Sequence, residues 1–308
     1  IMRISYKPYL LPTLIFSFML LSCQSNAGLE TIITVEQVGA AATPDKIVPI
    51  EGAPFEIPQL KRPVFPDFTI NIEEKGAKTN IPITSIVNQT IEEISQKGGG
   101  TVIIPKGKWK SGRIVLKSNV NLHLAEGSEI EFPGNAEDYL PTVFTRHEGI
   151  EIMGSGSFIY ANGEDNIAIT GKGVIYGPSL DAEIRQRPNG NTVVEKDILN
   201  NAPVEKRVFD GMDGRGFYKP KTISPINCTN VLIEGITMER STFWNVCPIY
   251  CENVIIRGIT VNSIGIPSGD GIDIESCKNV LIEYCTLNCG DDCFTCLLYT
   301  SPSPRDTE

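Results

Sequence analysis

Short apolar runs with one shared pattern recur along the C-terminal third of the chain. Three segments align without gaps, residues 228–237, 251–260 and 277–286, and each begins Cys-x-Asn-Val and ends in Thr. The runs are β-branched and bounded by Gly or Asn, which is typical of strands. Their spacing is a period in the twenties and indicates a solenoid. Leucine-rich repeats have a similar period, but their L-x-x-L-x-L pattern with a helical return is absent, so the pattern predicts an all-β parallel β-helix.

Equivalent residues of such a coil stack about 4.7–4.9 Å apart. We therefore expect two ladders, one of asparagines joined through their amides and one of cysteines: Asn230, Asn253 and Asn279, and Cys228, Cys251 and Cys277. Cys285 takes the slot that Ile236 and Ile259 fill in the preceding copies. There, cysteine is expected to behave as a small apolar core residue.

The upstream part of the chain predicts the start of this coil. A strand is expected over residues 68–72, and apolar residues at helical spacing predict a helix from Ile83 to Gln96 that ends at Gly98–Gly100. We expect this helix to cover the open first coil. Further strands are predicted over residues 101–104, 112–117, 120–124 and 129–132.

Two segments interrupt the strand pattern, residues 133–149 and the charged, polar residues 178–217. They are expected to be excursions off the coil, and such loops usually line a binding groove. His123 lies in an alternating run, with Leu122 and Leu124 inward, so it is expected to be a surface or ladder residue.

Residues 1–23 predict a lipoprotein signal peptide, because a basic start precedes a short apolar run and Leu20-Leu-Ser-Cys23 resembles a bacterial lipobox. An ordinary signal peptide is the alternative to lipidation at Cys23. Residues 24–66 predict a tether. The protein is then exported, periplasmic or at the outer membrane or cell surface, and meets the membrane only through this lipid anchor.

The coil domain is expected over residues 67–296. Residues 297–308 contain two prolines in a Ser/Thr setting, which cannot continue a β-coil. We interpret them as a foreign tail on a β-helix truncated at its C-terminal end.

The amino-acid composition limits the classes of partner that the chain is expected to bind. The net charge is −10 and there is no basic cluster, which argues against nucleic acid. Nine cysteines in an exported chain suggest disulfides, with Cys247–Cys251 and Cys289–Cys293 as candidate pairs, whereas the ladder pattern favours buried thiols. No zinc-type CxxC…CxxC spacing occurs, and neither a metal site nor a cofactor is predicted.

Aspartates recur after the strands of successive repeats. Asp270 lies in a Gly-rich turn, and Asp291 and Asp292 follow Gly290 one repeat later. Glycosidic cleavage needs one protonated carboxyl and one ionised carboxylate, and clustered aspartates supply both. Leaning apart, such groups are expected to reach the ~6.5–9.5 Å separation of inverting glycosidases. The alternative is a solvated turn.

Several stretches resemble the polygalacturonases and related pectinases of glycoside hydrolase family 28 over roughly residues 66–296. They are residues 98–107 with 116–124, then Phe243-Trp-Asn, Gly269–Asp273 and Thr286–Cys293 in order. The resemblance implies a right-handed, pectin-lyase-like parallel β-helix with a short N-terminal capping helix. It also implies a monomer that hydrolyses α-1,4-galacturonosyl linkages of pectic polysaccharide or oligogalacturonide with inversion.

By the same resemblance, Asp291 is the general acid, and Asp292 with Asp270 activates water, although Ser268-Gly269 replaces the family's Asn-Thr before Asp270. The family's downstream Gly-His-Gly and Arg-x-Lys motifs are absent, since the only histidines are His123 and His147. The chain is therefore expected to be an inactive fragment.

Other residues have two interpretations each. Trp244 could stack on a sugar ring or serve packing. Asp273 is expected to point outward, with a supporting or substrate-contacting role. The cations Lys219, Lys221 and Arg215 could meet uronate carboxylates or be solvated.

Two other functions stay open. A calcium-dependent, pectate-lyase-like polysaccharide lyase would use the aspartates as ligands, but no basic residue accompanies them in the strands. A non-catalytic carbohydrate-binding solenoid would leave them incidental.

Overall fold

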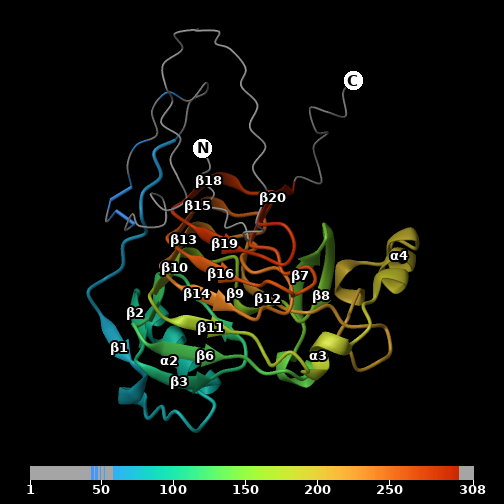
Figure 1. Ribbon diagram of the computed structural model, residues 1–308, viewed down its shortest axis with the longest axis horizontal. Helices are drawn as coiled ribbons and strands as arrows, with labels where there is room; N and C mark the ends of the chain where they lie inside the picture. Colours follow the sequence, from blue (N-terminus) through green and yellow to red (C-terminus); the bar gives the residue numbers. More distant parts are fainter. Residues whose placement is uncertain (1–42, 45, 48, 50–51, 53–57, 298–308) are drawn as a thin grey trace, which may run out of the picture.

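The computed structural model describes residues 43–44, 46–47, 49, 52 and 58–297. These residues form a right-handed parallel β-helix (Figure 1), which confirms the predicted fold class. The signal peptide with Cys23 and all of the predicted tail except Leu297 lie outside the described residues. Within the described ranges, no helix is long and apolar enough to cross a membrane.

The coils are built from three parallel sheets, and each full coil contributes one strand to each sheet, except that the coil containing Val246 and Ile249 crosses the third sheet through isolated bridges. Sheet A contains β1 (Thr69–Asn71), β2 (Gly100–Ile104), β5 (Val120–Leu124), β10 (Asp165–Gly171), β13 (Thr229–Glu234), β15 (Glu252–Arg257) and β18 (Lys278–Glu283). Sheet B contains β3 (Gly107–Lys110), β6 (Ser128–Glu131), β11 (Val174–Tyr176), β14 (Thr237–Glu239), β16 (Thr260–Asn262) and β19 (Thr286–Asn288).

Sheet C runs β4 (Ile114–Val115), β9 (Ser157–Asn162), β12 (Lys221–Ile226), then β17 (Ile272–Glu275) and β20 (Phe294–Leu297). Parallel bridges through Val246 and Ile249 join β12 to β17. The apolar core inside the coil is made by inward side chains of all three sheets.

The predicted ladders are present where the repeats stack in register. The side-chain amide of Asn253 donates to Asn230 at 3.3 Å, and that of Asn279 donates to Asn253 at 3.1 Å. All three asparagines have positive φ, between 54° and 57°, a left-handed conformation that asparagine tolerates better than most residues. Cys285 lies in the core as predicted.

Helix α2 (Thr84–Gln96) covers the first coil, as predicted. Its apolar face, which includes Val87, Ile91 and Ile94, is fully buried against the core of the coil. A 3-10 turn, η1 (Ile72–Lys75), packs beside it.

The two predicted excursions leave the coil between sheets B and C. The first contains η2 (Ala136–Tyr139) and an antiparallel hairpin of β7 (Val143–His147) and β8 (Ile150–Gly154), so it ends later than residue 149. The second contains α3 (Glu183–Gln186), α4 (Asn191–Leu199) and η3 (Val204–Lys206). Both lie on one side of the coil (Figure 1).

The described part of the predicted tether lies against the outer face of sheet A. Ile47, Leu60 and Phe65 pack on a row of apolar side chains from β10, β13, β15 and β18. We call these described residues (43–44, 46–47, 49, 52 and 58–66) the strap. Beside that row, Arg257 is fully buried and bonds Glu234 at 2.9 Å, Glu283 at 2.8 Å and the carbonyl of Pro44 at 2.7 Å.

We expect Arg257→Ala to lower the free energy of unfolding by about 3–5 kcal/mol, because it removes a fully buried cation, the partner of Glu283, and leaves Glu234 with Arg62 alone. Lys278→Ala is the matched control on the next strand. Its ion pair with Glu252 (3.2 Å) is largely exposed and should contribute about 0–1 kcal/mol. Denaturant unfolding of both variants measures this, and equal losses would contradict the role of Arg257.

Candidate active site

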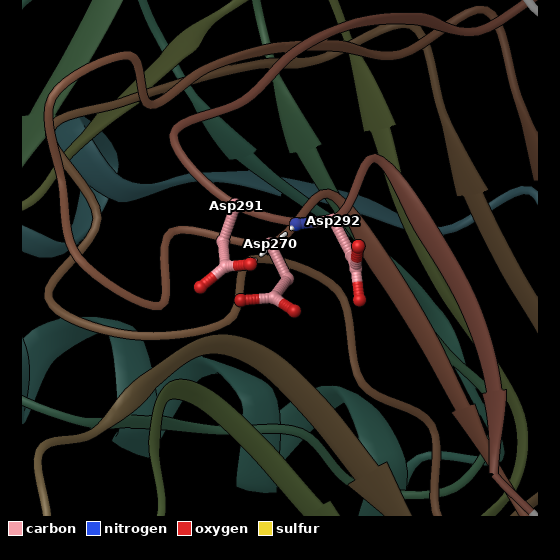
Figure 2. Close-up of side chains that lie close together, drawn as sticks. All are labelled: Asp270, Asp291 and Asp292. Carbon is pink, nitrogen blue, oxygen red and sulfur yellow. Dashed lines mark hydrogen bonds between the residues drawn. The ribbon is translucent and has the colours of Figure 1, made fainter.

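Three predicted aspartates come together at the corner between sheets B and C. Asp270 precedes β17, and Asp291 and Asp292 precede β20, so they lie on consecutive coils. Figure 2 shows their side chains projecting into one shared space. Both excursions leave from the same corner of earlier coils.

The trio is compact. One carboxylate oxygen of each aspartate lies within 4.8 Å of the corresponding oxygen of each of the others. A point about 2.8 Å from all three oxygens exists within such a triangle, and this is a hydrogen-bond length. One water molecule can therefore contact all three carboxylates.

Backbone bonds between coils fix this arrangement. The carbonyl of Asp270 accepts from the backbone N–H of Asn245 at 3.0 Å and from its side-chain amide at 2.8 Å. The carbonyl of Asp292 accepts from the N–H of Gly271 at 2.8 Å. Gly290 is required for close packing, since a Cβ there would lie 2.5 Å from the carbonyl oxygen of Ile266.

Asp270 differs from its two neighbours in burial. It is 6% exposed and its Oδ1 has no hydrogen-bond partner, whereas Asp291 and Asp292 are exposed. Burial, followed by the charge of Asp291, raises the pKa of Asp270 to about 6. Because the three groups interact, the proton belongs to the cluster rather than to one residue.

Asp273 was expected to point outward, but it is not exposed to solvent. It is fully buried in β17, and its Oδ1 accepts a hydrogen bond of 2.6 Å from Thr295 on β20. Burial raises its pKa to about 8. The excursions cover this face of sheet C, so the alternation that turned Asp273 away from the core did not expose it.

Buried charges surround Asp273 beneath the hairpin. Lys221, which was expected to be solvated or open to substrate, is 2% exposed and donates to the carbonyl of Arg146 at 2.5 Å. Arg146 in turn pairs with buried Glu275 at 3.5 Å. Burial raises the pKa of Glu275, although Lys221 and Arg146 oppose that shift.

The other two candidate cations have different surroundings. Arg215 pairs with Asp197 and lies over the ring of Phe209. Lys219 is partly buried, and burial, followed by the like charge of Arg185, lowers its pKa.

A column of rings attaches the hairpin to the coil. His147 stacks between Tyr218 at 4.0 Å and Phe243 at 5.0 Å, and Phe243 stacks on Trp244 at 4.9 Å. Trp244 is 7% exposed, which fits its packing interpretation. Burial, followed by the charge of Lys221, lowers the pKa of His147 to about 3, so it is neutral near pH 7 and its 3.8 Å contact with Glu148 is not an ion pair.

Sequence reasoning missed Asn245, Glu275 and Arg146 as residues that shape the site. Asn245 was visible only as part of the Phe-Trp-Asn stretch, and Arg146 lies 124 residues before Asp270 in the chain (270 − 146). Only the covering of sheet C by the hairpin brings Arg146 to the coil, and no local pattern predicts that.

The trio is also the one group of His, Cys, Asp and Glu side chains among the described residues that is placed to share a cation. Carboxylates are suitable ligands for Ca²⁺, but exposed acidic groups commonly cluster without an ion. No second feature of the site points to a metal.

Comparison with known proteins shows what the residues at this corner are similar to. Residues 210–301, which include all three aspartates, match the model of glycosyl hydrolases family 28. The chain is 37% identical to a Thermotoga maritima exopolygalacturonase of known structure, with a TM-score of 0.71. The part of the chain that carries the aspartates therefore matches glycosyl hydrolase family 28.

Two further proteins are similar to this chain. A Yersinia enterocolitica family 28 exopolygalacturonase is 25% identical with a TM-score of 0.58, over 75% of this chain and 44% of that one. An exo-poly-α-D-galacturonosidase of Dickeya chrysanthemi is 26% identical over 72% of this chain. The chain spans 41% of the Dickeya protein, and 56% of the Thermotoga chain against 77% of its own length.

The pKa of Asp273 sets a pH dependence of the stability of this protein. Because it is higher in the folded state (about 8) than the ordinary 3.8, the folded state binds the extra proton between these values. The free energy of unfolding therefore falls as the pH rises from about 4 to 8. We expect Asp273→Asn to remove on the order of a few kcal/mol of this fall.

Thermal and denaturant unfolding across pH 4–8 measure the effect. Asp67→Asn, at an exposed aspartate, is the matched control and should keep the wild-type slope. If Asp273→Asn also keeps it, the buried carboxyl does not titrate in this range.

Proposed function

We propose that this protein hydrolyses α-1,4-galacturonosyl linkages of pectic polysaccharide or oligogalacturonide, with Asp270, Asp291 and Asp292 as the reacting groups. The observation that carries the proposal is the close approach of three carboxylates, one buried with a raised pKa, at the corner overlooked by the excursions. The match of residues 210–301 to the family 28 model and the names of the relatives support the substrate class.

The three aspartates supply the protonated carboxyl and the ionised carboxylate that the reaction needs. Asp291, exposed toward the shared space, donates the proton to the leaving oxygen. Asp292 and Asp270 hold the water that attacks the anomeric carbon and accept its proton. The pKa of about 6 for Asp270 keeps one proton within the cluster in weakly acidic solution, and exchange among the carboxylates delivers it to Asp291.

Inversion, in which water attacks directly from the face opposite the leaving oxygen, rests on the family resemblance. A single displacement by water still fits, because one water can touch all three carboxylates. Neither a Gly-His-Gly nor an Arg-x-Lys motif occurs in the sequence. We therefore propose that turnover by the 308-residue chain is far below that of a chain carrying both motifs.

Long incubation with polygalacturonate and sensitive product analysis test the reaction. We expect saturated reducing ends, formed slowly and equally with or without a chelator. Proton NMR of the first products should show the β-anomer at the new reducing end. Unsaturated products that require calcium would instead indicate a lyase, and binding with no products would indicate a carbohydrate-binding solenoid.

Asp291→Asn should lower the rate of bond cleavage by about 10²–10⁴-fold, because it removes the proton donor. Oligogalacturonide affinity should change little, since the carboxamide keeps the shape of the side chain. Asp181→Asn, at an exposed aspartate of the second excursion, is the control. Equal rates in wild type and Asp291→Asn would contradict the assignment.

We further propose that cleavage takes place at a chain end. The first excursion places Glu148 near enough to raise the pKa of Asp270 slightly, so the hairpin tip borders the site on the side of the earlier coils. The relatives from Thermotoga, Yersinia and Dickeya carry exo names. A groove closed on one side accepts a polymer end more readily than its middle.

This mode predicts short products. We expect mono- or digalacturonate to accumulate from the first turnovers while the viscosity of the polygalacturonate solution falls slowly. Chromatography and viscometry of the same reaction measure both. A rapid loss of viscosity with a ladder of long oligomers would show internal cleavage.

Location is a separate proposal. The lipobox-like Leu20–Cys23 after a basic start and an apolar run supports export with lipidation at Cys23. The tether of residues 24–66 would then link the anchor to the coil.

A further inference from the structure

Two cysteines flank the loop that carries Asp291 and Asp292. Cys289 directly follows β19, and Cys293 directly precedes β20. Both are partly exposed free thiols that pack against the edge of the core. The Cys289 thiol lies within hydrogen-bonding contact of the Cys293 thiol, so the two ends of a five-residue segment meet through their sulfurs.

The ladder thiols in the described part of the chain also contact one another, but each of those contacts includes a buried thiol. Cys247 is fully buried. Cys251, its candidate partner by sequence, instead contacts the ladder thiols of Cys228 and Cys277 and carbonyls of the coil. Cys228 and Cys251 lie inside the coil, where an oxidant does not reach them.

The loop between Cys289 and Cys293 has few other restraints on its side chains. Asp291 and Asp292 are exposed, and their one hydrogen bond to each other runs from the Asp292 N–H to the Asp291 carboxylate at 3.1 Å. Backbone bonds from Gly271 to Asp292 and from Ile272 to Cys293 hold only the C-terminal half of the loop to the preceding coil. A covalent link at the base of the loop would restrain the rest.

We propose that Cys289 and Cys293 are a redox pair whose disulfide closes a ring around Gly290, Asp291 and Asp292 and fixes the two aspartates against Asp270. In the reaction, two S–H bonds break and one S–S bond forms. A disulfide oxidant such as glutathione disulfide takes up the two electrons and the two protons and leaves as two thiols. The sulfurs must move from contact to a bond of about 2.05 Å.

The bracing role rests on the proposed function of the aspartates, but formation of the bond does not. Burial, followed by the proximity of Cys293, raises the pKa of Cys289 to about 12. Since thiolates are the attacking species, closure of the ring is expected to be slow at neutral pH and faster in mildly alkaline solution.

Peptide mapping of the folded chain tests the bond. The protein is incubated with glutathione disulfide, free thiols are blocked with N-ethylmaleimide, and the chain is cut by a protease that cleaves before aspartate. Cleavage at Asp291 and Asp292 separates the two cysteines, so a disulfide leaves their peptides joined until reductant is added. We expect this joined species in wild type and in Cys285→Ser, and not in Cys289→Ser or Cys293→Ser.

Hydrogen exchange tests the brace without any assay of hydrolysis. Amides of residues 290–292 should exchange severalfold more slowly in the oxidised wild type than after reduction, whereas Cys289→Ser should exchange at one rate under both conditions. Two blocked thiols at Cys289 and Cys293 after oxidation, or a Cys247–Cys251 link in their place, would overturn the proposal. Unchanged exchange in the linked form would overturn the bracing role.

Discussion

The hydrogen-bonded register between consecutive coils is the constraint on which the candidate site depends. Bonds from Asn245 to Asp270 and from Gly271 to Asp292 set one turn directly on the next. They place carboxylates that are 21 residues apart in the chain (291 − 270) within reach of one water. A one-residue slip would turn these side chains to the other face. The asparagine ladder of sheet A supports the same register from the opposite side of the coil.

The excursions that cover the outer face of sheet C determine the surroundings of the buried residues beside the candidate site. It buries four charged side chains, Lys221, Arg146, Asp273 and Glu275, which the coil alone would leave in water. Such groups persist in an apolar setting only when they are paired, hydrogen-bonded or neutralised by a shift in pKa. Here an ion pair, a hydrogen bond and a raised pKa occur together. The stacked ring of His147 holds the hairpin that covers these residues.

Much of the fold follows from local pattern. The repeat period, the two ladders, the capping helix and the positions of both excursions were predictable because each depends on residues close in sequence or on identical neighbours. The meeting of Asp270 with Asp291 and Asp292 was predictable for the same reason, since equivalent positions of a repeat must stack. The distances between their carboxylates were not predictable, because they depend on how tightly Gly290 packs on the preceding turn.

The burial of Asp273 and Lys221 could not be foreseen from alternation. Period-two patterning tells which side chains leave the core, but not whether another segment covers them. The covering residues come from chain positions about 75–130 residues upstream of the residues they bury, as Arg146 over Lys221 and Glu275 illustrates (221 − 146 and 275 − 146). The same limit applies to the strap, whose composition resembles a free tether although its described residues lie on sheet A.

The strap also determines how mechanical load enters the molecule. Pro44 meets the buried Arg257 of β15, whereas Phe65 lies close to the start of the first coil, so the chain descends the outside of the solenoid before it begins to wind (Figure 1). A pull on the chain at Thr43 therefore acts first on the contacts of Pro44 at the aspartate-bearing end. The described residues of the strap would detach before the stacked strands separate.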